Sequence, residues 1–368
     1  MALALYRKYR PKNFSDIFGQ ESVVEVLKNA GKLDRIGHAY LFYGPRGTGK
    51  TTIARLLAKL AVCKTRETDK KFQTKGEPCN KCDACTAIDA GRAIDVVEID
   101  AATNTGVDEI RELKEGIRLA PSYFSRKVVI LDEVHMLSKS AFNALLKTLE
   151  EPPAHVLLIL ATTEFDKLPA TVTSRTQRYH FKKLTNAQIT EKLGAIAKEE
   201  EIDADTEALE LIASLSEGSL RDAESLLDQV RSVSAKVDVE SVEKNLGKVG
   251  LVRVGEFSAL LLREDLKGAL AYIQELEELG YNTTEFTREL IHYLRRVITL
   301  AFNSDLEVEF SKEFSSKELA MLKEHSALVA KEKHLPLLKG LILAYSQMRY
   351  SPFAAIPLEV ALIERFSK

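Results

Sequence analysis

A glycine-rich segment near the N-terminus carries the residue types that phosphate binding requires. It fits the pattern G-x-x-x-x-G-K-[ST], and we expect the residue after the pattern to contribute as well: Gly44, Pro45, Arg46, Gly47, Thr48, Gly49, Lys50, Thr51 and Thr52. Glycines let backbone N–H groups turn toward phosphate oxygens at a helix N-terminus, which already favours anions. In this pattern the lysine reaches the β- and γ-phosphates and the next hydroxyl binds Mg²⁺. The segment therefore predicts binding of ATP with Mg²⁺.

The flanks of this segment support the same interpretation. A short apolar run, residues 39–43, precedes it and predicts a strand, and residues 51–62 have helical periodicity. A phosphate loop needs this strand–loop–helix context, whereas a glycine-rich turn with a chance lysine does not.

Two adjacent carboxylates follow a second apolar run, residues 128–131. Asp132 would hold Mg²⁺, and Glu133 would polarise a water for in-line attack on the γ-phosphate. Acidic pairs at strand ends are often only solvated. Their position after a phosphate loop in the same chain favours the catalytic interpretation.

Threonine and arginine candidates complete this set. Thr163, with Thr162 as the alternative, follows the apolar run 156–161 and would hydrogen-bond the attacking water or the γ-phosphate. Arg175 would enter the site of a neighbouring subunit as an arginine finger. Arg221, on a later helix, would reach back to the γ-phosphate. The alternatives are an ordinary strand threonine and solvated surface arginines.

The cysteines are clustered, and there are only four of them: Cys63, Cys79, Cys82 and Cys85. Four thiolates with none left over predict a closed tetrahedral Zn²⁺ site with a structural role. An iron–sulfur cluster or a redox pair is the alternative.

Alternating strands and helices position these residues in the first half of the chain. The strands at 39–43, 96–99, 128–131 and 156–161, with helices between them such as 140–150, predict an α/β fold with a parallel sheet covered on both faces. No convincing strand follows Tyr179. A capping box at Thr185 and Gln188 opens a helical region, and amphipathic stretches cover 257–262, 266–279 and 285–302. We therefore expect three domains: 1–179, with a zinc module at about 63–85, then 180–243 and 244–368.

The composition is that of a folded, core-forming protein, because 45% of the 368 residues are hydrophobic and 29% are charged. This excludes disorder as the main state. We find no candidate signal peptide or membrane helix, so we expect a cytoplasmic protein.

The net charge of −2 conceals an uneven distribution of charged residues along the chain. Residues 1–198 carry 32 basic and 23 acidic groups, residues 199–243 carry 3 and 14, and residues 244–368 carry 17 of each.

Taken together, these segments resemble the gamma/tau subunits of bacterial DNA polymerase III, which are AAA+ clamp-loader ATPases. Besides the phosphate loop, the resemblance rests on residues 6–11 (YRKYRP), 18–20 (FGQ), 38–42 (HAYLF), 131–137 (LDEVHML), 142–153 (FNALLKTLEEPP), 161–163 (ATT), 174–175 (SR) and 218–223 (GSLRDA). It is dense over about residues 1–230. Clamp-loader small subunits of archaea and eukaryotes lack the cysteine insertion, and delta-prime subunits are not expected to keep an intact phosphate loop.

The resemblance implies an AAA+ domain, a helical lid and a helical collar through which subunits assemble. It implies as partners other copies of the chain, delta and delta-prime subunits, the sliding clamp and primer–template DNA. The residues that would flank the adenine are Arg7, Arg10, Pro11 and Val23. Thr176 stands where the family's Ser-Arg-Cys pattern has cysteine.

Two other functions fit parts of the pattern. One is another ring-forming AAA+ ATPase that processes DNA, such as a branch-migration motor or a recombination factor, although the cysteine insertion argues against it. The other is a zinc-stabilised scaffold that binds ATP without hydrolysing it, although Glu133 argues against that.

The net charge of +9 in residues 1–198 predicts DNA affinity in that segment. Such phosphate contacts would be independent of sequence and sensitive to salt.

Overall fold

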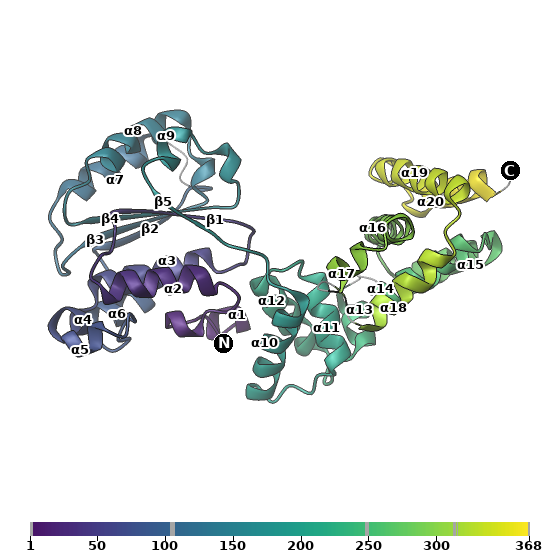
Figure 1. Ribbon diagram of the computed structural model, residues 1–368, viewed down its shortest axis with the longest axis horizontal. Coiled ribbons are helices and arrows are strands. Elements are labelled where there is room, and N and C mark those ends of the chain that lie inside the picture. The colour runs from purple at the N-terminus through teal and green to yellow at the C-terminus, as the bar shows by residue number, and fades with distance from the viewer. Residues whose placement is uncertain (1–2, 104–106, 247–249, 312–313, 315, 367–368) are drawn as a thin grey trace. The chain divides into compact units, whose positions relative to one another are not determined.

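A computed structural model describes residues 3–103, 107–246, 250–311, 314 and 316–366 (Figure 1). The chain forms two compact units. The first contains Met1–Leu184 together with Glu217–Asp222, and the second contains Thr185–Ser216 and Ala223–Lys368.

The first unit is built on a five-stranded sheet with the order β2-β3-β4-β1-β5. All neighbouring strands are parallel. The strands are β1 (Ala39–Tyr43), β2 (Val96–Asp100), β3 (Lys127–Asp132), β4 (Val156–Thr162) and β5 (Gln177–His180). The predicted α/β fold with a parallel sheet is therefore confirmed, and β5 is a strand that the sequence did not reveal.

Helices cover both faces of this sheet, with α2 and α3 on one side and α7 and α8 on the other (Figure 1). The helical segments of this part of the chain are α1 (Leu5–Lys8), η1 (Phe14–Asp16), α2 (Glu21–Lys32), α3 (Lys50–Val62), α4 (Lys64–Thr68), α5 (Lys70–Gln73), α6 (Asp83–Asp89), α7 (Val107–Arg118), η2 (Val134–Met136), α8 (Lys139–Glu150), η3 (Phe165–Lys167) and α9 (Ala170–Thr173).

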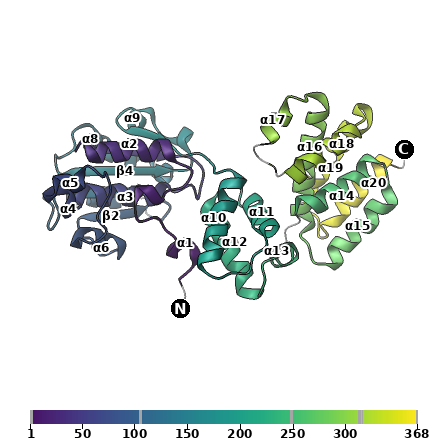
Figure 2. The same ribbon diagram turned by 60° about the horizontal axis from the view of Figure 1, so that its bottom comes forward.

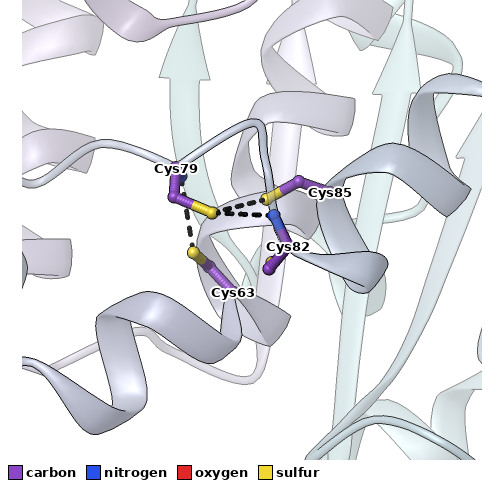
Figure 3. Close-up of side chains that lie close together, drawn as sticks. All are labelled: Cys63, Cys79, Cys82 and Cys85. Carbon is purple, nitrogen blue, oxygen red and sulfur yellow. Dashed lines mark hydrogen bonds between the residues drawn. The ribbon is translucent and has the colours of Figure 1, made fainter.

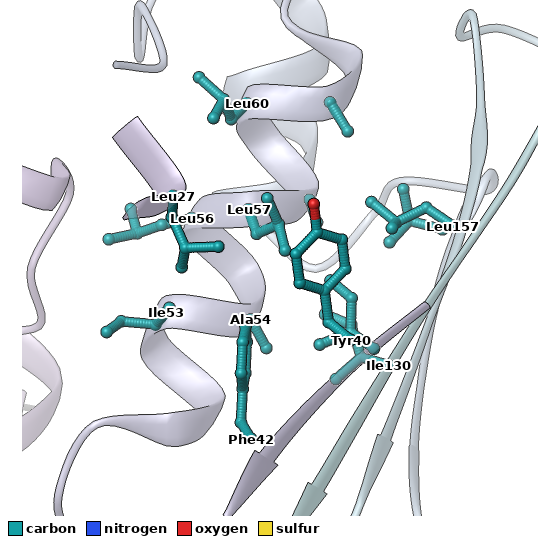
Figure 4. Packing of buried hydrophobic residues seen from close by; sticks show 14 of the residues in the cluster. Leu27, Tyr40, Phe42, Ile53, Ala54, Leu56, Leu57, Leu60, Ile130 and Leu157 are labelled. Carbon is teal, nitrogen blue, oxygen red and sulfur yellow. The ribbon is translucent and has the colours of Figure 1, made fainter. Parts of the chain in front are cut away.

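Alternate residues of each central strand serve two separate cores. Ile130 of β3 packs with α2 and α3, whereas its neighbour Leu131 packs with α7 and α8. Figure 4 shows the first of these cores, where Tyr40 and Phe42 of β1 lie against α3, next to Leu57 and Ala54 respectively. Burial on both faces explains why the central strands read as continuous apolar runs.

In the described residues of the second unit, the regular secondary structure is helical, apart from one isolated bridge between Ala204 and Val237. Thr185 and Gln188 form the predicted capping box at the start of α10. In Figure 2, α14, α16 and α19 lie together in the C-terminal part. The helices are α10 (Asn186–Glu199), α11 (Thr206–Leu215), α12 (Leu220–Val233), α13 (Val239–Leu246), α14 (Leu251–Leu262), α15 (Leu266–Glu278), α16 (Thr283–Phe302), α17 (Leu306–Phe310), α18 (Ser316–Ala327), α19 (Lys331–Met348) and α20 (Ala355–Phe366).

Among the described residues, no helix combines the length and the apolar character needed to cross a bilayer.

A buried carboxylate fixes the loop that enters β3. Asp95 is fully buried and accepts hydrogen bonds from the backbone N–H groups of Ser122, Tyr123 and Phe124, at 2.8, 2.6 and 2.9 Å. Burial opposes ionisation of Asp95, but these three donors outweigh it and hold the pKa of the carboxyl below its usual range.

Replacing Asp95 by alanine should lower the free energy of unfolding by about 2–4 kcal/mol, because three backbone donors lose their acceptor. Since the folded-state pKa is depressed, this stabilisation is present above the unfolded-state pKa of about 3.9 and is lost as the pH falls through the lower folded value. Urea unfolding of Asp95→Ala and the parent chain at neutral and acidic pH measures both effects. Glu115→Ala, at an exposed carboxylate on α7, is the control and should leave stability nearly unchanged. Equal stability of the parent and Asp95→Ala at neutral pH would contradict this account.

Candidate functional site

The phosphate loop connects β1 to α3, and its glycines adopt backbone conformations that other residues rarely do. The φ angles of Gly44, Gly47 and Gly49 are 144°, 72° and 100°. A Cβ atom on Gly44 would lie 2.2 Å from the carbonyl oxygen of Phe181, and one on Gly47 would lie 1.8 Å from Ser219 Oγ. The loop is therefore shaped for glycine by both torsion and close approach.

Lys50 is the first residue of α3, and its side chain folds over the loop. Its Nζ donates to the carbonyl oxygens of Gly44 at 2.8 Å and Pro45 at 2.7 Å. Burial lowers the pKa of Lys50, while the nearby carboxylates of Glu133 and Asp132 favour its charged form. The Lys50 amine is thus held at the helix N-terminus, where anions bind most readily.

The predicted magnesium residues are in direct contact. Thr51 Oγ1 donates to Asp132 Oδ2 at 2.7 Å, which joins the start of α3 to the end of β3. A hydroxyl and a carboxylate oxygen at one point are the hard ligands that Mg²⁺ prefers. This arrangement fits the ion expected from the sequence.

Glu133 and Thr163 also meet. The backbone N–H and the Oγ1 of Thr163 donate to Glu133 Oε2, at 3.0 and 2.8 Å. Thr162 instead lies with its Oγ1 2.9 Å from His135 Nδ1. Of the two threonines considered, Thr163 therefore contacts the candidate catalytic carboxylate. Glu133 itself has a φ of 47°, a left-handed conformation that is costly outside glycine and is typical of functional positions.

His135 is a site residue that the sequence analysis did not single out. Its ring nitrogens lie 3.3 Å from Glu133 Oε2 and 3.3 Å from Glu164 Oε1, and its side chain is only 7% exposed. The available signal was its place two positions after Glu133. The same analysis missed the bidentate pair in which Arg55 Nε and Nη2 donate to Glu98, at 2.7 and 2.8 Å.

The segment around Arg221 belongs to the first unit, because Glu217–Asp222 clusters with it. Ser219 lies against Gly47, and the Arg221 guanidinium lies 5.0 Å from the centroid of the Tyr6 ring. The structure therefore brings the candidate Arg221 to the same side of the phosphate loop as the N-terminal segment.

The residues expected to flank the adenine have different surroundings. Arg7 is exposed, and its Nε donates to Tyr6 Oη at 3.1 Å. Arg10 is half-buried, and burial and repulsion by Arg55 lower its pKa. Pro11 follows it with intermediate exposure. Val23 is only 5% exposed and packs in the core with residues of α2 and α3, so its side chain is largely covered by the protein itself.

Arg175 follows α9 by two residues, and its contacts lie at the ends of α8 and α9. Its Nη2 lies 2.7 Å from Glu150 Oε1 at the end of α8, and its Nη1 donates to the Thr171 carbonyl oxygen at 2.9 Å. The hydroxyl of Thr176 donates to backbone carbonyls of α9, at Val172 and Thr173. Arg175 is thus held at the protein surface by its own chain, with its side chain 35% exposed.

The four cysteines converge at the end of α3 (Figure 3). Their sulfur atoms all lie within 4.8 Å of one another, and Cys79 Sγ and Cys85 Sγ are 4.0 Å apart. A tetrahedron with Zn–S distances of about 2.3 Å has sulfurs about 3.8 Å apart, so the cluster fits zinc after a small contraction. A hydrogen bond from Cys85 lowers the pKa of Cys63 to about 4 and raises the pKa of Cys85. Cys63 therefore favours the thiolate form that binds metals.

Two known protein families match separate segments of this chain. The family described as "DNA polymerase III, delta subunit" matches residues 19–185. The family described as "DNA polymerase III clamp loader subunit, ATPase lid domain" matches residues 188–235. Among solved structures, the branch-migration motor RuvB of Thermotoga maritima covers 65% of this chain and 72% of its own, with 21% identity and a TM-score of 0.47. That likeness is too distant to bear on function.

Relatives that match most of this chain identify the family. The DNA polymerase III subunit tau of Bacillus subtilis is 40% identical over 98% of this chain and 62% of its own length. The tau subunit of Escherichia coli is 43% identical over 80% of this chain and 45% of its own length. The chain thus spans about half the length of these relatives. The gamma subunit of Buchnera aphidicola subsp. Baizongia pistaciae is 34% identical over 99% of this chain and 96% of its own. The chain therefore belongs to the gamma/tau family of DNA polymerase III subunits.

Proposed function

We propose that this chain is an ATP-hydrolysing motor subunit of the bacterial clamp loader, within the DNA polymerase III holoenzyme. ATP binding would favour a state that opens the sliding clamp and grips primer–template DNA, and hydrolysis would release both. Membership of the gamma/tau family and the match to a clamp-loader lid support this role. The polymerising activity would belong to another subunit.

The observation that carries the proposal is the meeting of four side chains at one edge of the sheet. Thr51 contacts Asp132, and Thr163 contacts Glu133, and both carboxylates lie near Lys50. This is the set needed to bind a triphosphate and to direct water at it. A chain that only bound ATP would have no use for a carboxylate at the position of Glu133.

In the proposed reaction the phosphate loop and Lys50 bind the β- and γ-phosphates of ATP. Thr51 and Asp132 would hold Mg²⁺, which neutralises charge that develops on the phosphate oxygens. Both hydrogen bonds from Thr163 go to Oε2 of Glu133, and a carboxylate has further acceptor sites with which Glu133 would orient a water in line with the γ-phosphate. Thr163 would hydrogen-bond that water or the phosphate.

Arginines would link hydrolysis to assembly. We assign Arg175 to the nucleotide of a neighbouring subunit, because its own contacts are with the ends of α8 and α9. Arg221 would sense the γ-phosphate from within the same chain, since its segment lies on the phosphate loop. The neighbours would be further copies of this chain and the delta and delta-prime subunits, joined through the C-terminal helices.

The basic N-terminal part of the chain would face the DNA. Its net charge of +9 over residues 1–198 suits contacts to phosphates, which bind any sequence and weaken with salt. Since the DNA of a bacterium lies in its cytoplasm, that is the compartment in which we expect the protein to act.

The cysteine cluster would hold one structural Zn²⁺ through all four sulfurs. A complete set of cysteine ligands leaves no open position for a substrate, so the metal would stabilise the insertion and take no part in hydrolysis.

Replacing Glu133 by glutamine should lower kcat for ATP hydrolysis by about 10²–10⁴-fold, because the amide cannot act as the general base. ATP binding should remain, since Lys50 and the phosphate loop are unchanged. Equilibrium binding of a fluorescent ATP analogue and steady-state hydrolysis measure the two effects. Asp166→Asn, at an exposed carboxylate in η3, is the control and should hydrolyse normally. Undiminished turnover by Glu133→Gln would rule out its catalytic role.

Primed DNA and the sliding clamp together should stimulate ATP hydrolysis by the assembled complex. Arg175→Ala should reduce this stimulated rate by about 10³-fold or more while leaving nucleotide affinity unchanged, because the finger would act on the neighbour's ATP. The measurement is steady-state hydrolysis by complexes reconstituted with delta and delta-prime.

Arg178→Ala is the matched control, since Arg178 is an exposed arginine on β5 close to Arg175 in sequence. An unchanged stimulated rate in Arg175→Ala would refute the finger. A parent complex that primed DNA and clamp fail to stimulate would refute the clamp-loader proposal itself.

The purified protein should contain about one zinc ion per chain, and its four thiols should react freely only after chelation. Cys79→Ser should lower the zinc content and the melting temperature together. Metal analysis and thiol titration in parallel test this. Protein that lacks zinc and has four freely titrating thiols, or that contains iron, would contradict the zinc assignment.

A further inference from the structure

We propose that Glu77 and Asn80 are positioning residues for nucleotide binding: they hold the N-terminal segment, residues 6–16, beside the phosphate loop. Both residues lie in the cysteine insertion, residues 63–89, which the proposed reaction does not otherwise use. The inference rests on the proposed function, because it assigns the insertion a role toward the same nucleotide site.

Glu77 grips one end of the N-terminal segment. Its Oε2 accepts from the backbone N–H of Phe14 at 2.7 Å, and its Oε1 accepts from that of Ser15 at 3.0 Å. Lys28 Nζ lies 2.8 Å from the same Oε1, and the Glu77 side chain is only 14% exposed. Charged acceptors make the stronger hydrogen bonds, so this carboxylate fixes the backbone where η1 begins.

Asn80 makes the second attachment. Its Nδ2 donates to Asn13 Oδ1 at 2.7 Å, and its Oδ1 accepts from Lys59 Nζ at 3.0 Å. Lys59 belongs to α3, is 2% exposed and also pairs with Asp89 at 2.5 Å. A single amide therefore joins the N-terminal segment to the helix that begins at the phosphate loop. The φ of Asn80 is 56°, a left-handed conformation that asparagine tolerates better than most residues.

The other end of the N-terminal segment lies at the nucleotide site. Tyr6 packs under Arg221, and Arg10 is half-buried among the charges of Arg55, Glu98 and Arg221. Only two residues separate Arg10 from Asn13, and one of them is Pro11, whose ring fixes φ. Anchoring residues 13–15 therefore restricts where Arg10 can lie.

These contacts are not needed to form the cysteine cluster. Cys79 Sγ accepts from the backbone N–H groups of Lys81 and Cys82, and Cys63 Sγ accepts from that of Cys79. The side chains of Glu77 and Asn80 instead form hydrogen bonds away from the cysteines, with residues 13–15 and with Lys59. A metal bound by the cysteines would hold the backbone segment that carries these two side chains.

The test is Glu77→Gln in the full chain, which keeps the shape of the side chain but removes its charge. We expect the Kd for a fluorescent ATP analogue and the KM for ATP to rise about 3- to 10-fold, with kcat nearly unchanged. Hydrogen exchange at the amides of Phe14 and Ser15 should become faster. Zinc content should stay at the parental value.

Glu67→Gln is the matched control, because Glu67 lies in the same insertion but its carboxylate accepts from Ser125 and not from the N-terminal segment. If Glu77→Gln loses metal or unfolds, Asn13→Ala removes the Asn80 contact from the other side and should raise the Kd in the same way. Parental Kd and KM in both variants would overturn the positioning role. Lys50→Ala is measured alongside the other variants. Loss of ATP binding in Lys50→Ala would support the nucleotide site, so that a failed Glu77 test would count against the positioning role alone. Normal ATP binding in Lys50→Ala would overturn both proposals.

Discussion

The register of three parallel strands is the constraint on which the candidate site depends. Tyr43 at the end of β1 is paired with Thr162 at the end of β4, and Leu131 of β3 is paired with Leu160. The phosphate loop, Asp132 and Thr163 therefore leave the sheet at the same edge. A shift of one residue would exchange the two faces of β3 and would place apolar side chains on the wrong core. The packing of alternate strand residues against the two cores thus also fixes which polar residues meet.

The sequence predicted those parts of the fold that burial dictates. β3 and β4 are covered on both faces, so each reads as an unbroken apolar run. β5 has the sequence QRYH, is mostly exposed and lies at the end of the sheet order beside β1, so it carries no such pattern. The sequence also could not decide between the neighbouring threonines Thr162 and Thr163. Consecutive side chains on an extended backbone point in opposite directions, so only one of the two could face the site. Only the fold shows that Thr163 reaches Glu133 while Thr162 reaches His135.

Contacts that span long stretches of sequence were out of reach of any local pattern. Glu77 meets Phe14 across 63 positions, and Asn80 meets Asn13 across 67. Nothing in the composition of the polar insertion distinguishes these two residues from the solvated ones around them. Their significance comes from what the N-terminal segment does at its other end, where Tyr6 and Arg221 meet.

Helix α3 connects these features physically. At 1.5 Å per residue, its 13 residues span about 20 Å. It begins with Lys50 and Thr51 at the phosphate loop, pairs through Lys59 with the insertion, and ends where Cys63 joins the cysteine cluster. Most of its side chains are buried, so a displacement at one end cannot be absorbed by bending into solvent. A metal at one end of this helix and a nucleotide at the other would therefore both contact the same packed element.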